Sequence, residues 1–251
     1  MLKTRMIPTV LFKNGIVAKS KKFTEHRNIG SCINVVRVYN AREVDELVFL
    51  DITATKEDRK LPIAIVREVL DECFMPLTVG GGVKTVDDIN MLLRIGADKV
   101  SINSEAVKRP EFISEAAKKF GAQCVVVSID AKKKDGGYEV FTEGGSKPTG
   151  LDPVAWAKKC EELGAGEILI NSIDNDGMMD GYDIELTKIV SDAVSIPVIA
   201  CGGAGSLEDF VKAIKEGHAS AVSASSIFLF TQTTPKNVKE SMAEAGIDVR
   251  L

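Results

Sequence analysis

Short runs of β-branched and other apolar residues alternate along this chain with longer amphipathic stretches. Eight runs have the length and composition of buried strands: RMIPTVLF, ELVFLDI, PLTVGG, KVSIN, CVVVSID, EILINSI, PVIACGG and SAVSAS. The stretches between them carry apolar residues at helical spacing, as in TVDDINMLLRIG and SLEDFVKAIKEG, and several end in glycine. Eight βα units in 251 residues predict an α/β protein, a (β/α)8 TIM barrel. A Rossmann-like sheet is the alternative, but no GxGxxG motif follows the first strand.

The chain also repeats itself. Glu46-Leu-Val-Phe-Leu-Asp51 aligns with Glu167-Ile-Leu-Ile-Asn-Ser172 at an offset of 121 residues. Three further elements align at the same offset: Val79–Gly82 with Ala200–Gly203, Thr85–Asp88 with Ser206–Asp209, and Lys99–Ser104 with Ser220–Ser225. The repeat predicts a single barrel domain over residues 1–251, made of two similar half-barrels of about residues 1–120 and 121–251. A ligand site in one half is then expected in the other.

Charge and cysteine content narrow the class of protein. A net charge of −4 with no long basic run favours a small molecule or another protein as partner, not nucleic acid or a membrane surface. The five cysteines are scattered and form no cluster at metal-ligand spacing, so we expect reduced thiols, no metal and no cofactor. The apolar start of the chain is interrupted by proline and is interpreted as a first strand. These features predict a cytoplasmic protein.

The strand ends that form the mouth of a βα barrel carry glycine and small polar residues here. Asn103 with Ser104, and Ala224 with Ser225, close the fourth and eighth strands, and glycines follow the third and seventh. Glycine lets the backbone approach an anion closely, and N–H groups at a helix start attract it. Two such sites predict a ligand with a phosphate at each end. Tight βα turns, which need glycine anyway, are the structural alternative.

Carboxylates end several of the predicted strands. Asp130 follows the apolar run VVVSID, which suits a general acid or base, although an Asp that caps the loop explains the same pattern. Asp51 ends the second strand, and Asp174 and Asp176 follow the sixth in a segment rich in turn formers. The repeat leads us to expect a second carboxylate at the end of the first strand, where Leu11 stands instead.

Charged residues open four of the predicted strands at the opposite, N-terminal end of the barrel. Two are basic and two acidic: Arg5, Glu46, Lys99 and Glu167. Single charges at such positions usually face solvent. Together, these four could instead form a ring of ion pairs across the barrel floor, which would compensate the cost of burying them.

These motifs together resemble the cyclase subunit of imidazole glycerol phosphate synthase, a glutamine amidotransferase barrel of histidine biosynthesis. The similarity covers essentially the whole chain and includes DELVFLDITA, TVGGG, GADKVSIN, VVVSIDAK, SIDNDG and IACGGAG. The resemblance implies that a glutaminase docks at the N-terminal face and releases ammonia. The ammonia then passes a salt-bridge gate and travels through the barrel to the mouth.

The resemblance also implies roles for individual residues. The gate matches Arg5, Glu46, Lys99 and Glu167, and a glutaminase contact matches Asp98. Catalytic carboxylates match Asp130 and Asp176, and two other active-site positions match Asp51 and Lys19. The phosphate-binding positions match Gly82, Asn103, Ser104, Gly177, Gly203, Ala224 and Ser225.

The chain departs from the family pattern at the mouth. Leu11 replaces the main catalytic aspartate, and Thr9, Asn171 and Cys201 replace other family residues. Loss of a positioned acid or base removes about 10² to 10⁴ in rate, which argues against ring closure by the usual mechanism. The whole pattern, with HRNIGSCINVVRVYN and DECFMPL, resembles a divergent branch associated with bacterial surface-sugar biosynthesis. That resemblance implies a third protein, a sugar amidotransferase that converts an acetamido group to an acetamidino group.

Three functions follow from these observations. The first is a barrel subunit that conducts ammonia and leaves the chemistry to partners. The second is a lyase that closes an imidazole ring in histidine biosynthesis, which the phosphate-site motifs favour. The third, a sugar-phosphate isomerase of a related barrel family, also needs a carboxylate where Leu11 stands. Leu11 beside the four floor charges favours the first.

Overall fold

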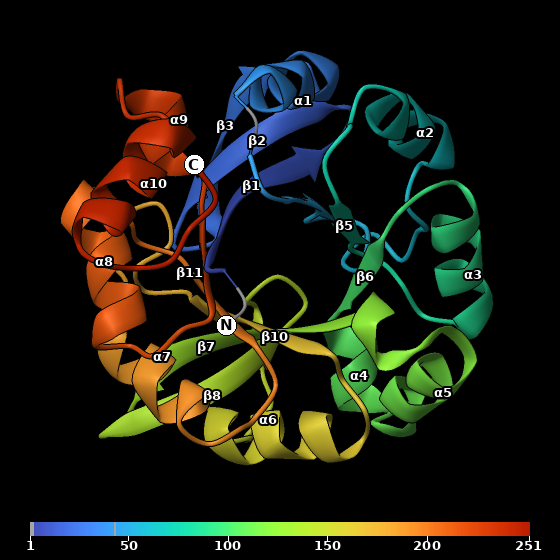
Figure 1. Cartoon of the computed structure of the whole chain (residues 1–251). Helices are drawn as coiled ribbons and strands as arrows, with labels where there is room; N and C mark the ends of the chain where they lie inside the picture. The colour runs from blue at the N-terminus through green and yellow to red at the C-terminus, as the bar shows by residue number, and fades with distance from the viewer. Residues whose placement is uncertain (1–2, 43) are drawn as a thin grey trace.

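The computed structural model describes residues 3–42 and 44–251. In this part of the chain eight parallel strands close a barrel: β1 (Arg5–Lys13), β4 (Leu47–Asp51), β5 (Leu77–Gly80), β6 (Lys99–Ile102), β7 (Val125–Lys134), β10 (Glu167–Ser172), β11 (Val198–Cys201) and β12 (Ala221–Ala224). Pairing runs in chain order around the barrel, and the two halves meet where β6 pairs with β7 and where β12 pairs with β1 (Figure 1). The predicted (β/α)8 fold is confirmed, with one barrel strand in each predicted run.

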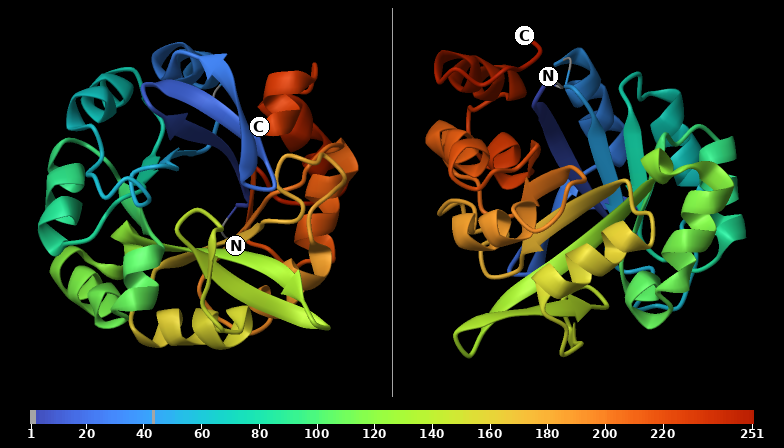
Figure 2. Two further views of the ribbon diagram at one scale, coloured as in Figure 1. Left: turned by 180° about the vertical axis from the view of Figure 1, so that it is seen from behind. Right: turned by 60° about the horizontal axis from the view of Figure 1, so that its bottom comes forward.

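Helices form the outer wall of the barrel (Figures 1 and 2). They are α1 (Cys32–Ala41), α2 (Ile63–Asp71), α3 (Val86–Arg94), α4 (Ser104–Lys108), α5 (Glu111–Phe120), α6 (Pro153–Glu162), α7 (Ile184–Ser191), α8 (Leu207–Lys215), α9 (Ser226–Phe230) and α10 (Pro235–Glu244), with a 3-10 turn at Ala122–Cys124. Within the described residues, no helix is both long enough and apolar enough to span a bilayer.

The interior of the barrel is arranged in tiers, because successive strand residues point alternately inward and outward. The lowest tier carries four charged residues, three of which open β1, β6 and β10, while Glu46 directly precedes β4. Above it lies an apolar cluster, separate from the core beneath the helices, formed by Ile7, Val48, Val126, Leu169, Ile199 and Ala221. The top tier is polar and opens at the mouth. The same alternation of inward and outward side chains therefore places charged, apolar and polar residues at three successive tiers of the barrel interior.

The two halves of the barrel share local structure at corresponding positions. Thr85 and Ser206 each begin a helix with a capping box, completed by Asp88 and Asp209 respectively. The third and eighth helices of the chain, α3 and α8, therefore start in the same way at the offset of 121 residues. This local agreement matches the repeat in the sequence.

Strand register corrects the fourth match of the repeat by one residue. Val79 pairs with Val100 in the first half, and Ala200 pairs with Val222 in the second, so β12 follows β6 by one residue more than the other elements do. The added residue is His218, which has a left-handed backbone (φ 57°) in the turn before β12. Asn103 therefore corresponds to Ser225, and Ser104 to Ser226, not to Ala224 and Ser225 as the sequence alignment predicted.

Two hairpins extend the barrel strands, and the apolar pattern did not predict them. Strand β1 continues into β2 (Ile16–Lys21) and β3 (Thr24–Gly30), and β7 continues into β8 (Gly137–Thr142) and β9 (Lys147–Pro148). Both hairpins lie over the mouth end of the barrel (Figure 2, left). Their turns approach each other, since a Cβ on Gly145 would lie 2.7 Å from the Phe23 ring.

The apolar tier predicts a strong dependence of stability on its leucine. Leu169→Ala, at 1% exposure, should lower the free energy of unfolding by about 2–5 kcal/mol, because it removes buried contacts and leaves a cavity. The control Leu207→Ala changes a leucine that is 36% exposed and should cost much less. Urea unfolding followed by circular dichroism measures both. Equal losses would contradict a packed barrel interior.

Candidate functional site

A cavity of about 170 Å³ opens at the carboxyl ends of the barrel strands. The predicted phosphate-binding residues all line it: Gly82, Asn103, Ser104, Gly177, Gly203, Ala224 and Ser225. Asp130, Asp176 and Leu11 line it too. The sites predicted in the two half-barrels therefore open into one shared cavity. A single ligand can contact both.

The glycine loops on each side of this cavity have backbones that side chains rarely adopt. Gly82 has φ of 68° and Gly203 has φ of 115°. A Cβ at Gly203 would lie 2.0 Å from the Gly181 carbonyl oxygen, and one at Gly82 would lie 2.8 Å from that of Arg59. The backbone conformation of these turns therefore requires glycine at both positions, as the tight-turn alternative predicted. The backbone they expose remains accessible from the cavity.

Three buried polar atoms at this cavity have no hydrogen-bond partner among the described residues. They are the Asn103 Oδ1, Asn171 Oδ1 and Ser226 Oγ atoms, and Ser226 is 6% exposed. Buried polar groups normally have partners, so a polar ligand at the cavity would complete their hydrogen bonding. Ser226 was not among the predicted residues, because a fixed offset of 121 residues aligns this part of the repeat one residue out of register. In the corrected register, Ser226 corresponds to the predicted residue Ser104.

Asp130 is the carboxylate with the most perturbed environment in the cavity. Burial and, to a smaller extent, the negative charge of Asp176 raise its pKa to about 7, while side-chain amides of Asn103 and Asn171 partly offset the shift. The Asn103 Nδ2 atom donates a hydrogen bond to the carboxylate over 2.8 Å. Near neutral pH, Asp130 is therefore suited to take up or release a proton.

Asp176 is buried nearby and is held by the β2 strand. The Lys19 Nζ atom lies 3.2 Å from its Oδ1 atom, and the Ser20 hydroxyl donates to its Oδ2 atom over 3.1 Å. Lys19 is itself only 4% exposed. The neighbouring Gly177 lies against the same strand, where a Cβ would lie 2.1 Å from the Ser20 carbonyl oxygen. These contacts fasten the β2–β3 hairpin to the loop after β10.

The remaining two predicted carboxylates are occupied by contacts within the chain. Asp51 forms an ion pair with Arg59 at 2.6 Å and accepts hydrogen bonds from the backbone of Thr53 and Ala54. Asp174 accepts from the backbone N–H of Lys133 at 3.0 Å, outside the cavity lining. Both have a structural role in this conformation. The described residues include no group of three His, Cys, Asp or Glu side chains placed to hold a metal.

Leu11 lies opposite Asp130 in the half-barrel repeat. Leu11 pairs with Leu50 between β1 and β4, as Asp130 pairs with Asn171 between β7 and β10. Leu11 is 9% exposed and lines the cavity with an apolar side chain that cannot transfer a proton. Cys201 does not replace it, because burial raises the pKa of its thiol to about 12. Of these two corresponding register positions, only the one occupied by Asp130 has a proton-transfer group.

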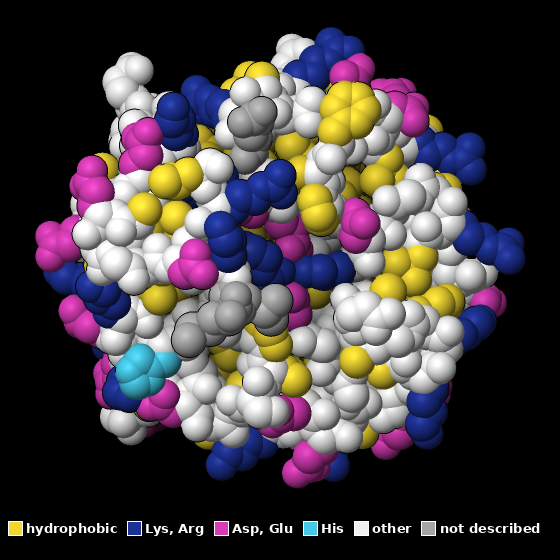
Figure 3. All heavy atoms as spheres, viewed as in Figure 1, with side chains coloured by type: hydrophobic (Ala, Val, Ile, Leu, Met, Phe, Trp, Pro, Cys, Tyr) yellow, Lys and Arg dark blue, Asp and Glu magenta, His cyan; other side chains and the backbone are white. Residues whose placement is uncertain are grey.

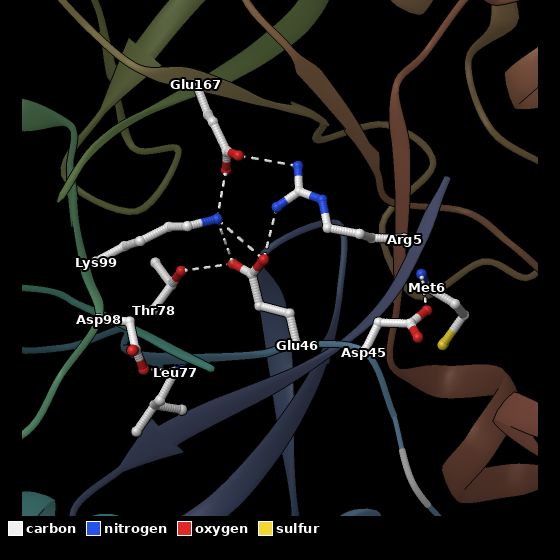
Figure 4. A network of polar contacts seen from close by, with 9 residues as sticks. All are labelled: Arg5, Met6, Asp45, Glu46, Leu77, Thr78, Asp98, Lys99 and Glu167. Carbon is white, nitrogen blue, oxygen red and sulfur yellow. Dashed lines mark hydrogen bonds and ion pairs between the residues drawn. The ribbon is translucent and has the colours of Figure 1, made fainter. Parts of the chain in front are cut away.

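The four charged residues at the barrel floor form a closed ring of ion pairs (Figure 4). Arg5 lies 2.6 Å from Glu46 and 2.9 Å from Glu167. Lys99 lies 3.0 Å from each of the same two glutamates. The Thr78 hydroxyl also donates to Glu46 over 2.9 Å. Every charge in the ring thus meets two opposite charges, which compensates its removal from water.

The ring lies at the centre of the N-terminal face, where basic and acidic side chains gather (Figure 3). Asp98 lies beside it on this face, exposed, and its carboxylate accepts a hydrogen bond from the backbone N–H of Leu77 over 2.8 Å (Figure 4). Strand β5 therefore connects the two features, because Leu77 contacts Asp98 and Thr78 contacts the ring. The structure brings all five predicted floor residues into one region.

Fold and site together define a (β/α)8 barrel with a charged floor and a ligand-sized cavity at its mouth. The family model described as histidine biosynthesis protein matches residues 5–234 of the chain. The chain belongs to the histidine biosynthesis protein family. The match spans nearly the whole barrel and confirms the predicted resemblance at the level of the family.

The raised pKa of Asp130 predicts a pH-dependent cost to stability. Its folded pKa, about 7, lies above the ordinary value of 3.8, so ionisation opposes folding increasingly from about pH 4 to pH 7. Asp130→Asn should therefore gain stability relative to the parent over that range, by up to a few kcal/mol. Urea unfolding at pH 4, 5.5, 7 and 8 measures the difference. Asp174→Asn is the control outside the cavity, and a parallel profile for Asp130→Asn would refute the shift.

Proposed function

We propose that this chain is the barrel subunit of a glutamine amidotransferase complex. It receives ammonia from a glutaminase at its N-terminal face and conducts it to the mouth, for amidination of a nucleotide-activated surface sugar by a separate amidotransferase. One contrast carries this proposal: the floor has a complete ion-pair ring, whereas the mouth has Leu11 opposite Asp130. A conduit needs the floor, and a ring-closing lyase needs both carboxylates.

The interior above the ring supports selective passage of neutral ammonia. The cluster of six apolar residues includes Ile7, Val48 and Leu169 and lies between the ring and the mouth. Moving the charged ammonium ion into such surroundings has a large unfavourable free energy. Moving neutral ammonia there is much less unfavourable. The ring closes the path in this conformation, and Lys99 bridges Glu46 and Glu167 through one ammonium group at the end of an unbranched chain. Movement of the Lys99 side chain is the simplest way to open the floor.

The N-terminal face also presents apolar surface suited to a protein partner. Phe74 is 80% exposed in the segment that precedes β5, and Pro76 beside it is exposed as well. An exposed aromatic side chain of this kind is typical of an interaction site. It lies four residues before Thr78, which contacts the ring. Figure 3 displays hydrophobic side chains next to the charged centre of this face.

The mouth supports a second candidate function, an imidazole-ring-closing lyase of histidine biosynthesis. The pKa of Asp130 near 7 and the unpartnered Asn103 and Ser226 atoms suit a phosphorylated ligand that undergoes proton transfer. Leu11 weighs against it, since the usual chemistry uses an acid or base on each side. We therefore propose the phosphorylated-ligand site as a retained feature of a chain whose own ring-closing step is weak.

Lys99→Ala tests the conduit. The variant leaves Glu46 and Glu167 with Arg5 alone, so the floor should lose its closed ring while the barrel stays folded. In a reconstituted system of chain, glutaminase and sugar amidotransferase at low external ammonium, amidinated sugar formed per glutamine hydrolysed should fall. Lys159→Ala removes a surface pair with Glu162 on α6 and is the matched control. An unchanged ratio for Lys99→Ala, or absence of any glutaminase bound to this face, would count against the proposal.

Leu11→Asp tests the lyase candidate. The parent chain, given ammonium salt and the family's bis-phosphorylated ribulosyl substrate, should have activity about 10² to 10⁴ below that of a cyclase with both carboxylates. Restoring a carboxylate should raise the rate, and Leu11→Asn, which adds polarity without an acid, should not. Product formation is followed by liquid chromatography. Full cyclase activity in the parent chain would overturn the conduit as its main function.

A further inference from the structure

The hairpin of β2 and β3 is the most strongly basic segment in an otherwise acidic chain. Residues 13–27 contain five Lys or Arg and one acidic residue, whereas the whole chain has a net charge of −4. The hairpin runs along the rim of the mouth (Figure 2, left). It therefore concentrates positive charge at the end of the barrel where ammonia would leave.

Internal contacts hold this hairpin in a defined position. Lys19 and Ser20 bind the buried Asp176 carboxylate, and the backbone N–H of Lys22 donates to the Asp176 carbonyl oxygen over 2.8 Å. One lysine is thus used for attachment. The other cations lie on a hairpin whose backbone is held in place. This reduces the conformational entropy lost when a partner binds them.

The remaining cations of the hairpin lie outside the cavity lining. Lys21, Lys22 and Arg27 are exposed and do not line it. Among the described side chains, neither these three nor Lys13 takes part in an ion pair. The lowered pKa of His26 reflects its partial burial first and then the charges of Lys13 and Lys56. Like charges gathered with no ion-pair partner among the described side chains raise the local potential and favour an acidic binding partner.

We propose that the β2–β3 hairpin docks the acidic surface of the protein that takes up ammonia at the mouth. The inference rests on the proposed conduit function, because only a conduit needs a second protein at this end. A small anionic ligand explains the arrangement less well, since Lys21, Lys22 and Arg27 lie outside the cavity in which such a ligand would bind. A protein surface laid across the rim reaches all three.

Charge reversal tests this inference with a closely matched control. Lys21→Glu with Lys22→Glu reverses the adjacent pair at the hairpin, and Lys118→Glu with Lys119→Glu reverses an adjacent exposed pair on α5. The probe is the purified sugar amidotransferase of the three-protein system, with association measured by biolayer interferometry at low and high salt. The hairpin variant should associate about tenfold more slowly at low salt, with a weaker salt dependence. The α5 variant should match the parent.

Other outcomes separate this inference from the conduit proposal. Glutaminase binding and glutamine hydrolysis should be unchanged in the hairpin variant, while amidinated sugar per glutamine falls at low external ammonium. Unchanged association of the hairpin variant, or an equal loss in the α5 variant, overturns hairpin docking even when coupling is intact. Binding of a nucleotide sugar to the chain alone that weakens in the hairpin variant also overturns it, because the cations would then serve a small ligand. Absence of glutaminase binding in the parent instead overturns the conduit itself.

Discussion

Closure of eight strands into a barrel forces alternate residues of each strand into a narrow interior, and the chemistry of this protein follows from that constraint. Side chains at the N-terminal ends of β1, β6 and β10, together with Glu46 directly before β4, converge at one level, where two positive and two negative charges form ion pairs. Two residues further along these strands, β1, β4 and β10 contribute Ile7, Val48 and Leu169 to the apolar tier. A slip of one residue would exchange inward and outward side chains and dismantle both levels. Strand register therefore determines which side chains face inward at the floor, in the apolar tier and at the mouth.

The mouth departs from the symmetry of the barrel in its chemistry, while the backbone retains it. Leu11 and Asp130 occupy corresponding register positions, yet one is apolar and the other has a pKa near neutrality. Asp176 forms an ion pair with Lys19, whereas burial raises the pKa of Asp130 to about 7. The two halves of the site therefore differ in chemistry at this position and share the backbone register beneath it.

Sequence patterns predicted the barrel well because buried parallel strands and their helices leave strong signals. Each apolar run became a strand, and the charges that open four strands met at the floor. Short, partly polar strands such as β2 and β8 lack that signal, so the hairpins were missed. Arg59 could not be assigned to Asp51 from spacing alone, because the loop between them folds back on itself. The one-residue shift at His218 hid Ser226, since alignment at a fixed offset cannot detect an insertion between matched elements.

His218 reveals where this architecture tolerates change in length. The extra residue is accommodated in a turn by a left-handed backbone, and β12 keeps its register with β1 and β11. Within a strand, the same insertion would have turned every following side chain to the other face. The turns between helices and strands can therefore accept an added residue without changing the register of the strand that follows. A gene for a hybrid barrel could therefore be joined at such turns, with one half-barrel from this chain and the other from a different barrel.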